Sequence, residues 1–310
     1  MNEAETRADH IDPALKAAGY GSSPIGVIGF GVMGSSMALN LAKNGLQVLG
    51  YSRTASKVSA LEHSGITLSS PDEIAQLCKV VLLSVSDGPA VQEILFGAYG
   101  IAPKLARGAL IIDTTTNAPS EALSFATKCR ELGLDLLDAP VTGGDVGARN
   151  ATLTIMCGGP EETFQRALPF LNLIGKRIVL MGPSGSGQMM KAVNQVAVGL
   201  SIVAMTEALL LAERRGLNST QALEILQSGA AGSWALSNYA PRLMSGDLKP
   251  GFDAAHMLKD LKIALKEAAG HCSLPGTEIT TELFEQLVTL HKGVGNHALI
   301  KAYENVIPLG

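Results

Sequence analysis

Two separated segments of this chain carry residue types that could do chemistry together. The first is Gly29-Phe30-Gly31-Val32-Met33-Gly34, whose glycine spacing lets the backbone amides at the start of a helix hold a pyrophosphate. The second runs from Gly185 to Asn194 and places Lys191 and Asn194 three residues apart, so that an ammonium and a carboxamide share one helical face. Together the two segments suggest dinucleotide chemistry in which a lysine serves as the acid.

The glycine segment gains specificity from its context, because glycines also mark ordinary turns. It follows the apolar run from Ile25 to Ile28 and opens a helix-like stretch that reaches Lys43. Asn44-Gly45 is typical of a helix end, and a second apolar run ends at Tyr51. This complete βαβ unit predicts a dinucleotide-binding turn in which residues 29–34 contact the cofactor.

The end of the second predicted strand indicates which dinucleotide is bound. An NAD enzyme places a carboxylate there for the adenosine ribose, whereas this chain has Ser52-Arg53-Thr54, with Lys57 nearby. An arginine at this point can pair with a 2′-phosphate, although it could also be a solvated loop residue. Because the expected acid is missing, we predict that NADP(H) is favoured over NAD(H) and that Ser52, Arg53 and Thr54 contact it.

Polar segments end other apolar runs, where an open α/β sheet exposes its ligand crevice. In the segment from Asp138 to Gly144, Thr142 can donate a hydrogen bond, and the amides of Gly143 and Gly144 can approach a carboxylate or a developing oxyanion. Taken alone, this segment is more typical of a turn. We keep Thr142, Gly143 and Gly144 as candidate substrate contacts.

Two further strand ends could meet the cofactor. Asp113-Thr114-Thr115-Thr116 follows an apolar run and could edge the nicotinamide pocket. Val85 and Ser86 stand where the run from Val80 ends, and we count them among the candidate cofactor contacts.

Lys191 is the candidate catalytic residue, although most lysines are solvated surface charges. Met189, Met190, Ala192 and Val193 flank it in an apolar helix, which favours a buried ammonium facing a cleft. Such a lysine can donate a proton to an oxygen as hydride arrives at the adjacent carbon.

Other notable residues have ordinary interpretations by themselves. Lys259-Asp260 is typical of a surface charge pair. Trp234 at a helix junction favours core packing, but it could also be a pocket wall, and we keep it as a candidate substrate contact. The six histidines show no metal-ligand spacing, so no metal is expected, and the four cysteines are widely spaced, as in a reducing cytoplasm.

Composition limits the kinds of partner. The 310 residues are 46% hydrophobic and 17% charged with a net charge of −4, so a broad positive field for nucleic acid or an anionic membrane is not expected. No run approaches the roughly 18 uninterrupted apolar residues of a membrane span. Residues 1–22 are acidic and predicted to be a poorly ordered leader, unlike a signal or transit peptide. We expect a cytoplasmic protein that acts on a small molecule.

The order of elements predicts two domains. Residues 23–183 alternate apolar runs with helix-like segments, which predicts an α/β, doubly wound, mostly parallel sheet of the Rossmann type. The predicted strands are 25–28, 47–51, 80–85, 110–112, 134–137, 153–156 and 178–180. Residues 184–310 lack such runs and predict an all-helical domain that begins with one long helix, from Gln188 to Arg215. Its nearly continuous apolarity implies burial by the second domain or by a partner subunit, so we expect a homodimer or homotetramer.

These motifs jointly resemble the β-hydroxyacid dehydrogenase family, which includes 3-hydroxyisobutyrate dehydrogenases, tartronate semialdehyde reductases and glyoxylate/succinic semialdehyde reductases. The resemblance covers nearly the whole chain after the leader, with residues 29–34, 138–144, 185–194 and 259–260 in the family order. It implies that Lys191 is catalytic and that Thr142, Gly143 and Gly144 hold the substrate carboxylate with Asn194. It also implies that Thr116 lies beside the cofactor and that Lys259 closes over the site.

The branch within the family stays open. Asn194-Gln195 and the stretch from Lys249 to Phe252 look most like tartronate semialdehyde reductases, whereas Arg53 resembles the NADP-using semialdehyde reductases, and residues 144–149 suggest a less characterised branch. The sequence thus predicts an NADP(H)-dependent oxidoreductase of a small carboxylate. The alternatives are an NAD-dependent 3-hydroxyisobutyrate- or serine-type dehydrogenase and, from another class, a non-catalytic dinucleotide-binding interaction module.

Overall fold

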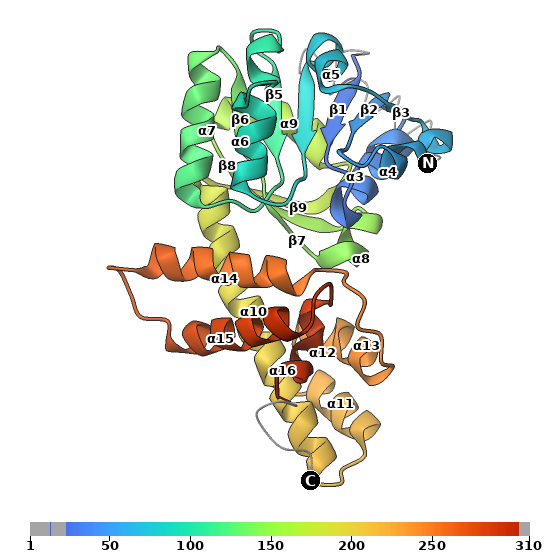
Figure 1. Ribbon diagram of the computed structural model, residues 1–310, viewed down its shortest axis with the longest axis vertical. Helices are drawn as coiled ribbons and strands as arrows, with labels where there is room; N and C mark the ends of the chain where they lie inside the picture. The colour runs from blue at the N-terminus through green and yellow to red at the C-terminus, as the bar shows by residue number, and fades with distance from the viewer. Residues whose placement is uncertain (1–12, 14–22, 304–310) are drawn as a thin grey trace. The chain divides into compact units, whose positions relative to one another are not determined.

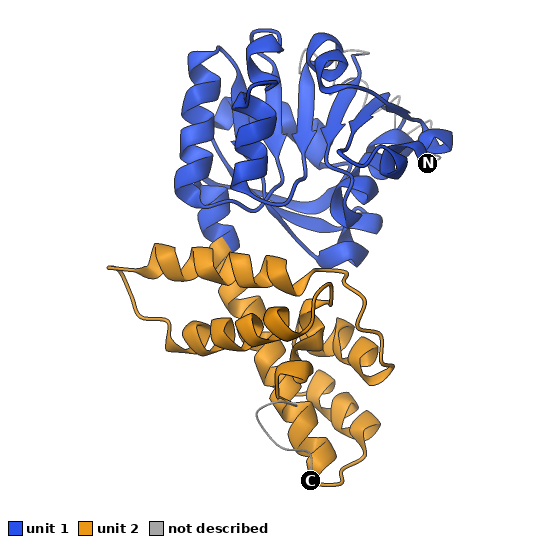
Figure 2. Ribbon diagram, viewed as in Figure 1, with its two compact units in different colours: residues 1–191 blue, residues 192–310 orange. Residues whose placement is uncertain are grey.

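The structure is a computed structural model, which describes residue 13 and residues 23–303. The predicted leader therefore lies outside the described residues except for Pro13. The described chain forms two compact units that divide between Lys191 and Ala192 (Figure 2).

The first unit is built on a nine-stranded sheet within the described residues (Figure 1). The strand order is β3-β2-β1-β4-β5-β6-β8-β7, with β9 also paired to β8. The strands from β3 to β6 are parallel, and β8 joins β6 in the antiparallel sense. The strand order runs outward from β1 to β3 on one side and from β4 to β6 on the other, which confirms the predicted Rossmann-type sheet. The strands are β1 (Ile25–Ile28), β2 (Val48–Tyr51), β3 (Ile66–Leu68), β4 (Val80–Leu83), β5 (Leu110–Asp113), β6 (Asp135–Asp138), β7 (Val141–Thr142), β8 (Leu153–Gly158) and β9 (Gly175–Gly182).

Helices cover both faces of this sheet because successive strand residues point to opposite sides. Val80 and Leu82 of β4 pack in the core under α3 and α9, whereas Val81 and Leu83 pack under α5, α6 and α7. The first unit contains α3 (Val32–Lys43), α4 (Ser56–Ser59), α5 (Pro71–Leu77), α6 (Gly88–Phe96), α7 (Pro119–Glu131), α8 (Gly144–Arg149) and α9 (Glu161–Leu171), with short 3-10 turns η2 (Glu62–Ser64) and η3 (Ala102–Lys104).

The predicted strands are all present, with bounds that shift by a few residues. Two short strands, β3 and β7, were not predicted. β3 has only three residues, and β7 has two and follows Pro140, so neither produces an apolar run that stands out from a loop. The predicted helix end at Asn44-Gly45 is confirmed, because α3 ends at Lys43 and Gly45 has a φ of 78°.

The second unit is helical and has its own hydrophobic core. Ile202 and Met205 from the long helix pack with Met257, Leu261 and Phe284 from later helices. The elements that contribute residues to this unit are α10 (Ser186–Arg214), α11 (Ser219–Ser228), α12 (Trp234–Asn238), α13 (Ala240–Met244), α14 (Ala254–Ala268), α15 (Pro275–Leu290), η4 (Asn296–Leu299) and α16 (Ile300–Tyr303). The first six residues of α10 belong to the first unit.

Candidate active site

The three glycines after β1 have three different surroundings. Gly29 has a φ of +103°, and a Cβ there would collide with the carbonyl oxygen of Ser84, so the tight turn requires glycine. A Cβ on Gly34 would collide with the carbonyl oxygen of Gly29, so this glycine allows α3 to pack closely. A Cβ on Gly31 would meet no atom within 4 Å. Open space above the backbone at Gly31 fits a ligand phosphate that approaches the turn.

The start of α3 is suited to an anion. Among the described residues, no side chain caps Gly31, and the first turn of α3 contains no acidic residue. The amides and the helix dipole therefore keep their positive character. Phe30 has a buried side chain that packs into the core, so only its backbone is available to a cofactor, whereas Val32 is 49% exposed and Met33 is half-buried. This turn fits the pyrophosphate of a dinucleotide.

The loops after neighbouring strands lie at the same edge of the sheet as the glycine turn. Arg53 follows β2, which pairs with β1, and its side chain is exposed. Ser52 accepts a hydrogen bond at its Oγ from the Thr54 amide at 3.3 Å. After β4, the Val85 amide donates to Thr115 Oγ1 at 3.2 Å, which ties the β4 loop to the β5 loop. The residues predicted to contact the cofactor in this unit therefore follow adjacent strands.

Asp138 at the end of β6 holds the start of α10. Its Oδ1 accepts the Gly185 amide at 2.7 Å, and its Oδ2 accepts the Gln188 amide at 3.1 Å. Burial raises the pKa of Asp138 to about 6, although the backbone amides of Gly185 and Gln188 act to lower it. A carboxylate at a helix N-terminus stabilises that helix end, so Asp138 anchors the helix that carries Lys191.

Asp113 organises the loop after β5. Its Oδ1 accepts the Thr115 amide at 3.0 Å, and its Oδ2 accepts Asn117 Nδ2 at 2.7 Å. Burial raises the pKa of Asp113 to about 7, and the charge of Asp138 adds to this rise. The loop that contains Thr116 is thereby shaped by a buried carboxyl group.

Lys191 is buried, as predicted, with 5% of its surface exposed. Its Nζ donates a hydrogen bond to the carbonyl oxygen of Val141 at 2.9 Å. Val141 immediately precedes Thr142, Gly143 and Gly144, which are half-buried. Gly143 and Gly144 have φ values of 126° and 64°, a backbone conformation that requires glycine. The structure therefore brings the lysine to the segment predicted to hold a carboxylate.

Two hydrogen bonds and an ion pair in the second unit connect Asn194, Gln195, Asp260 and Lys259. Asn194 Nδ2 donates to Gln195 Oε1 at 2.8 Å, and Gln195 Nε2 donates to Asp260 Oδ2 at 2.7 Å. Lys259 Nζ lies 3.0 Å from Asp260 Oδ1. Asp260 is only 1% exposed, so the interpretation of Lys259-Asp260 as a surface pair is wrong for the aspartate. The α14 face that carries it is apolar around it, which the local sequence does not reveal.

Trp234 begins α12 and is 42% exposed, so the core interpretation is wrong. Its ring meets Tyr239 edge-on, with ring centroids 4.8 Å apart, and Tyr239 in turn stacks on His297. An exposed ring on a rigid aromatic support remains a candidate substrate contact.

The long helix α10 is less covered within the described chain than its apolarity predicts. Met189, Val193, Leu200 and Leu211 are all at least 37% exposed. Of the described helices, α10 is the one long and apolar enough to cross a membrane by length and composition, a property that core helices of soluble proteins share.

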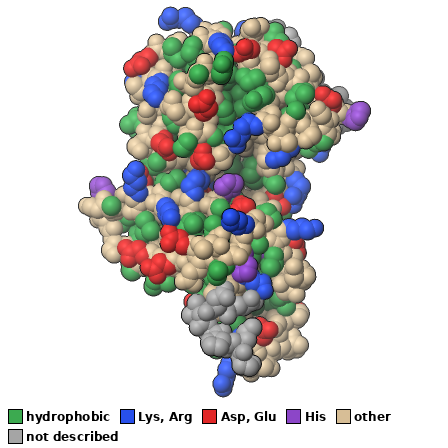
Figure 3. Space-filling view, in the orientation of Figure 1, with side chains coloured by type: hydrophobic (Ala, Val, Ile, Leu, Met, Phe, Trp, Pro, Cys, Tyr) green, Lys and Arg blue, Asp and Glu red, His purple; other side chains and the backbone are tan. Residues whose placement is uncertain are grey.

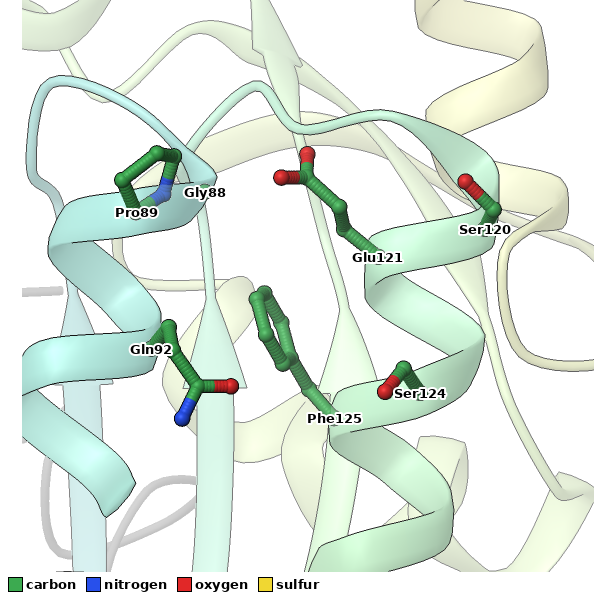
Figure 4. A pocket seen from close by; sticks show the side chains of 7 residues that line it. All are labelled: Gly88, Pro89, Gln92, Ser120, Glu121, Ser124 and Phe125. Carbon is green, nitrogen blue, oxygen red and sulfur yellow. The ribbon is translucent and has the colours of Figure 1, made fainter. Parts of the chain in front are cut away.

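A shallow pocket of about 420 Å³ lies between the first turns of α6 and α7 (Figure 4). None of the predicted site residues lines it. The Glu121 carboxylate in its wall accepts a hydrogen bond from the Ala118 amide at 2.9 Å, and so caps α7. The pocket is therefore separate from the candidate site. It is lined by Gly88, Pro89, Gln92, Ser120, Glu121, Ser124 and Phe125.

The sequence motifs do not show how several of their polar residues organise the site. Asp113 and Asp138 lie inside two of the motifs, and Gln188 and Gln195 flank Lys191 in the same helix. The available signal was an acid as the last residue of a buried strand, because an acid there must find hydrogen-bond donors beyond the strand.

Comparisons with known proteins identify the family of the chain. A family profile described as the NAD binding domain of 6-phosphogluconate dehydrogenase matches residues 24–182, and one described as NAD-binding of NADP-dependent 3-hydroxyisobutyrate dehydrogenase matches residues 185–303. An uncharacterized oxidoreductase of Synechocystis is 45% identical over 91% of this chain and 98% of its own length. The 2-hydroxy-3-oxopropionate reductase of Escherichia coli is 37% identical over 90% of this chain and 97% of its own length.

A solved structure extends the likeness to the whole fold. The 3-hydroxyisobutyrate dehydrogenase from Salmonella typhimurium superimposes with a TM-score of 0.84 at 26% identity, covering 90% of this chain and 99% of that one. The two family profiles match the Rossmann-type part and the helical part of the chain one after the other. The chain therefore belongs to the β-hydroxyacid dehydrogenase family and is an NAD(P)-dependent oxidoreductase.

Proposed function

We propose that this protein transfers a hydride between NADP(H) and a small carboxylate that bears an aldehyde, ketone or hydroxyl group, with Lys191 as the general acid and base. The observation that carries the proposal is the hydrogen bond from Lys191 Nζ to the Val141 carbonyl at 2.9 Å. It keeps a buried ammonium beside the glycine segment that begins at Gly143.

In this proposal each residue of the site has a separate role. Thr142 and the amides of Gly143 and Gly144 hold the substrate carboxylate, and Asn194 and Trp234 contribute further contacts. Lys191 donates a proton to the carbonyl oxygen in the reductive direction and accepts it in the oxidative direction. Bound NADPH supplies the hydride. A positioned proton donor of this kind contributes about 10²–10⁴-fold in rate.

NADP(H) is the preferred cofactor in this proposal. Arg53 is exposed at the end of β2, where it can pair with a 2′-phosphate, and no carboxylate occupies residues 52–54 to grip a free ribose hydroxyl. The turn at residues 29–34 holds the pyrophosphate, and Val85, Ser86, Thr116 and Lys259 complete the contacts.

The substrate is a β-hydroxy acid or semialdehyde such as 2-hydroxy-3-oxopropionate, glyoxylate or succinic semialdehyde. The likeness to 2-hydroxy-3-oxopropionate reductase of Escherichia coli supports the first of these. On the face drawn in Figure 3, acidic and basic side chains are interspersed, and the net charge is −4, which favours a small-molecule partner over nucleic acid.

We place the protein in the cytoplasm as a homodimer or homotetramer. The exposed apolar side chains of α10, Met189, Val193, Leu200 and Leu211, supply a surface that a second subunit would cover. Light scattering after gel filtration checks this assembly, and a monomer mass would contradict it. Recovery of the untagged protein in a membrane pellet that resists salt would contradict the cytoplasmic assignment.

The decisive experiment compares NADPH and NADH oxidation with glyoxylate, 2-hydroxy-3-oxopropionate, succinic semialdehyde and methylmalonate semialdehyde. We expect turnover with NADPH and a loss of about 10²–10⁴-fold in kcat for Lys191→Ala. Turnover of the variant within about tenfold of the parent would refute the role of Lys191. Tight NADPH binding without turnover of any carbonyl acid would favour a non-catalytic dinucleotide-binding module.

A second candidate is an NAD-dependent dehydrogenase of 3-hydroxyisobutyrate. The structural likeness to the 3-hydroxyisobutyrate dehydrogenase of Salmonella typhimurium favours it. Oxidation of 3-hydroxyisobutyrate with NAD at a higher kcat/KM than reduction of every semialdehyde with NADPH would select this candidate.

A further inference from the structure

We propose that Gln188 is a positioning residue for Lys191. Its side chain fastens the first turn of α10 to the backbone of residues 115–117 and so keeps the lysine ammonium beside Val141. This inference rests on the proposed function, because it assumes that Lys191 is the acid. Gln188 does not act on the reacting atoms itself.

Both polar atoms of the Gln188 carboxamide form hydrogen bonds. Oε1 accepts a hydrogen bond from the Asn117 amide at 3.0 Å, and Nε2 donates to the Thr115 carbonyl at 2.7 Å. Gln188 is only 1% exposed, so neither bond is exchanged for water at low cost. The carboxamide donates and accepts at the same time, whereas the Met thioether has no donor and is only a weak acceptor, and ionised Glu only accepts.

The main chain of Gln188 is held as well. Its amide donates to Asp138 Oδ2 at 3.1 Å, and the Gly185 amide donates to Asp138 Oδ1 at 2.7 Å. Asp138 lies three residues before Val141, the residue whose carbonyl accepts from Lys191. Residues 138–141 therefore form hydrogen bonds with α10 at two places, near its start and at Lys191.

Gln188 also connects the lysine to the predicted cofactor side of the site. Residues three apart on a helix are neighbours, so Gln188 lies one turn before Lys191 on the same face. Thr116 stands between the two residues that Gln188 binds, and Thr115 Oγ1 accepts the Val85 amide at 3.2 Å. A shift of the first turn of α10 would move the ammonium relative to these loops, and a displacement of about 1 Å can cost about 10²-fold in rate.

The test is Gln188→Met, which keeps the side-chain length, removes the donor and leaves only a weak acceptor. For Gln188→Met we expect kcat to fall by about 10–10²-fold, with KM for NADPH within about threefold of the parent. The matched control is Gln165→Met, because Gln165 is exposed on α9, where its Nε2 donates to Glu161 Oε1 on the same helix. A thermal melt of each variant checks that it is folded.

A second variant keeps the test open if Gln188→Met does not fold. Gln188→Glu retains an acceptor for the Asn117 amide and, when ionised, loses the donor to the Thr115 carbonyl. We expect a smaller fall in kcat than for Gln188→Met, again without a matching rise in KM. Equal kcat values for parent and both folded variants would overturn the proposal.

A double-mutant cycle separates positioning from general structural support. In the Lys191→Ala background, single-turnover rates at high enzyme concentration should be the same with and without Gln188→Met. A Gln188→Met loss of the same size in both backgrounds would overturn the positioning role.

Labelling of Lys191 by an amine-reactive reagent tests its placement without a measurement of activity. If Lys191→Ala alone retains the parent rate, the proposed function fails, but the labelling rate still reports where Lys191 lies. We expect faster labelling of Lys191 in Gln188→Met than in the parent, and equal labelling would refute the inference independently of activity.

Discussion

Asp113 and Asp138 occupy paired positions on the adjacent strands β5 and β6, and both carboxyl groups are fully buried. Each is the last residue of its strand, and each turns to satisfy backbone amides beyond it. Asp113 shapes the loop after β5, and Asp138 anchors α10, so the two carboxyl groups join the predicted cofactor side of the unit to the helix that carries Lys191.

The contribution of these two carboxyl groups to the stability of the protein should fall as pH rises through the range in which they ionise. Burial raises the pKa of Asp113 to about 7 and of Asp138 to about 6, above the value of about 4 in an unfolded chain. The native state therefore binds more protons than the unfolded state between these values, and the stabilisation present below about pH 4 is lost as pH rises to about 7. Asp113→Asn should reduce this slope.

Urea unfolding at several pH values between 4 and 8 measures the slope, with the exposed Asp72→Asn as the control. An Asp113→Asn variant whose free energy of unfolding depends on pH with the parent slope would contradict the assignment.

Gly34→Ala should lower the stability of the fold, whereas Gly31→Ala should lower the affinity for NADPH. A Cβ on Gly34 collides with the Gly29 carbonyl, so Gly34→Ala should destabilise the fold by about 1–3 kcal/mol. A Cβ on Gly31 meets no protein atom within 4 Å, so Gly31→Ala should melt like the parent but bind NADPH at least about tenfold more weakly. Calorimetry of unfolding and of NADPH binding separates the two effects, and a Gly31→Ala variant with parent affinity would show that the open space is not used by the cofactor.

Arg53→Ala should change the cofactor preference and leave the fold intact. The guanidinium is exposed at the end of β2, so its loss removes a charge-assisted contact to the 2′-phosphate without opening a cavity. We expect KM for NADPH to rise by about tenfold or more, whereas KM for NADH stays within about twofold. Lys57→Ala, a nearby exposed charge, serves as the comparison. Equal losses with both cofactors would speak against phosphate recognition by Arg53.

Asp260→Asn should be more costly than the loss of an exposed charge pair. Asp260 is buried, contacts Lys259 Nζ at 3.0 Å and accepts from Gln195 Nε2 at 2.7 Å. Asp260→Asn removes the buried charge that Lys259 Nζ contacts and weakens the acceptor for Gln195 Nε2, and we expect a loss of about 1–3 kcal/mol in the free energy of unfolding. Glu285→Gln, which removes the exposed partner of Lys262, should cost at most about 1 kcal/mol. Similar losses for both variants in denaturant titrations would contradict this ranking.

The sequence by itself determined the class of fold, the positions of its main strands and the identity of the candidate lysine. Parallel strands buried on both faces appear as apolar runs, so β4 and β5 are visible without a structure, and the glycine turn after β1 has a spacing that few other structures need. The helix end at Asn44-Gly45 is visible for a similar reason, because a local backbone conformation there favours glycine.

Only the tertiary structure decided which polar groups meet. Asp138 and Gly185 are separated by 47 residues, and Gln188 and Thr115 by 73, yet both pairs are hydrogen-bonded. Such contacts depend on which strands are neighbours in the sheet and on where α10 begins, and neither is encoded in local periodicity. The burial of Asp260 and the exposure of Trp234 were hidden for the same physical reason, since the burial of a side chain is set by the elements packed around it and not by its neighbours in the chain.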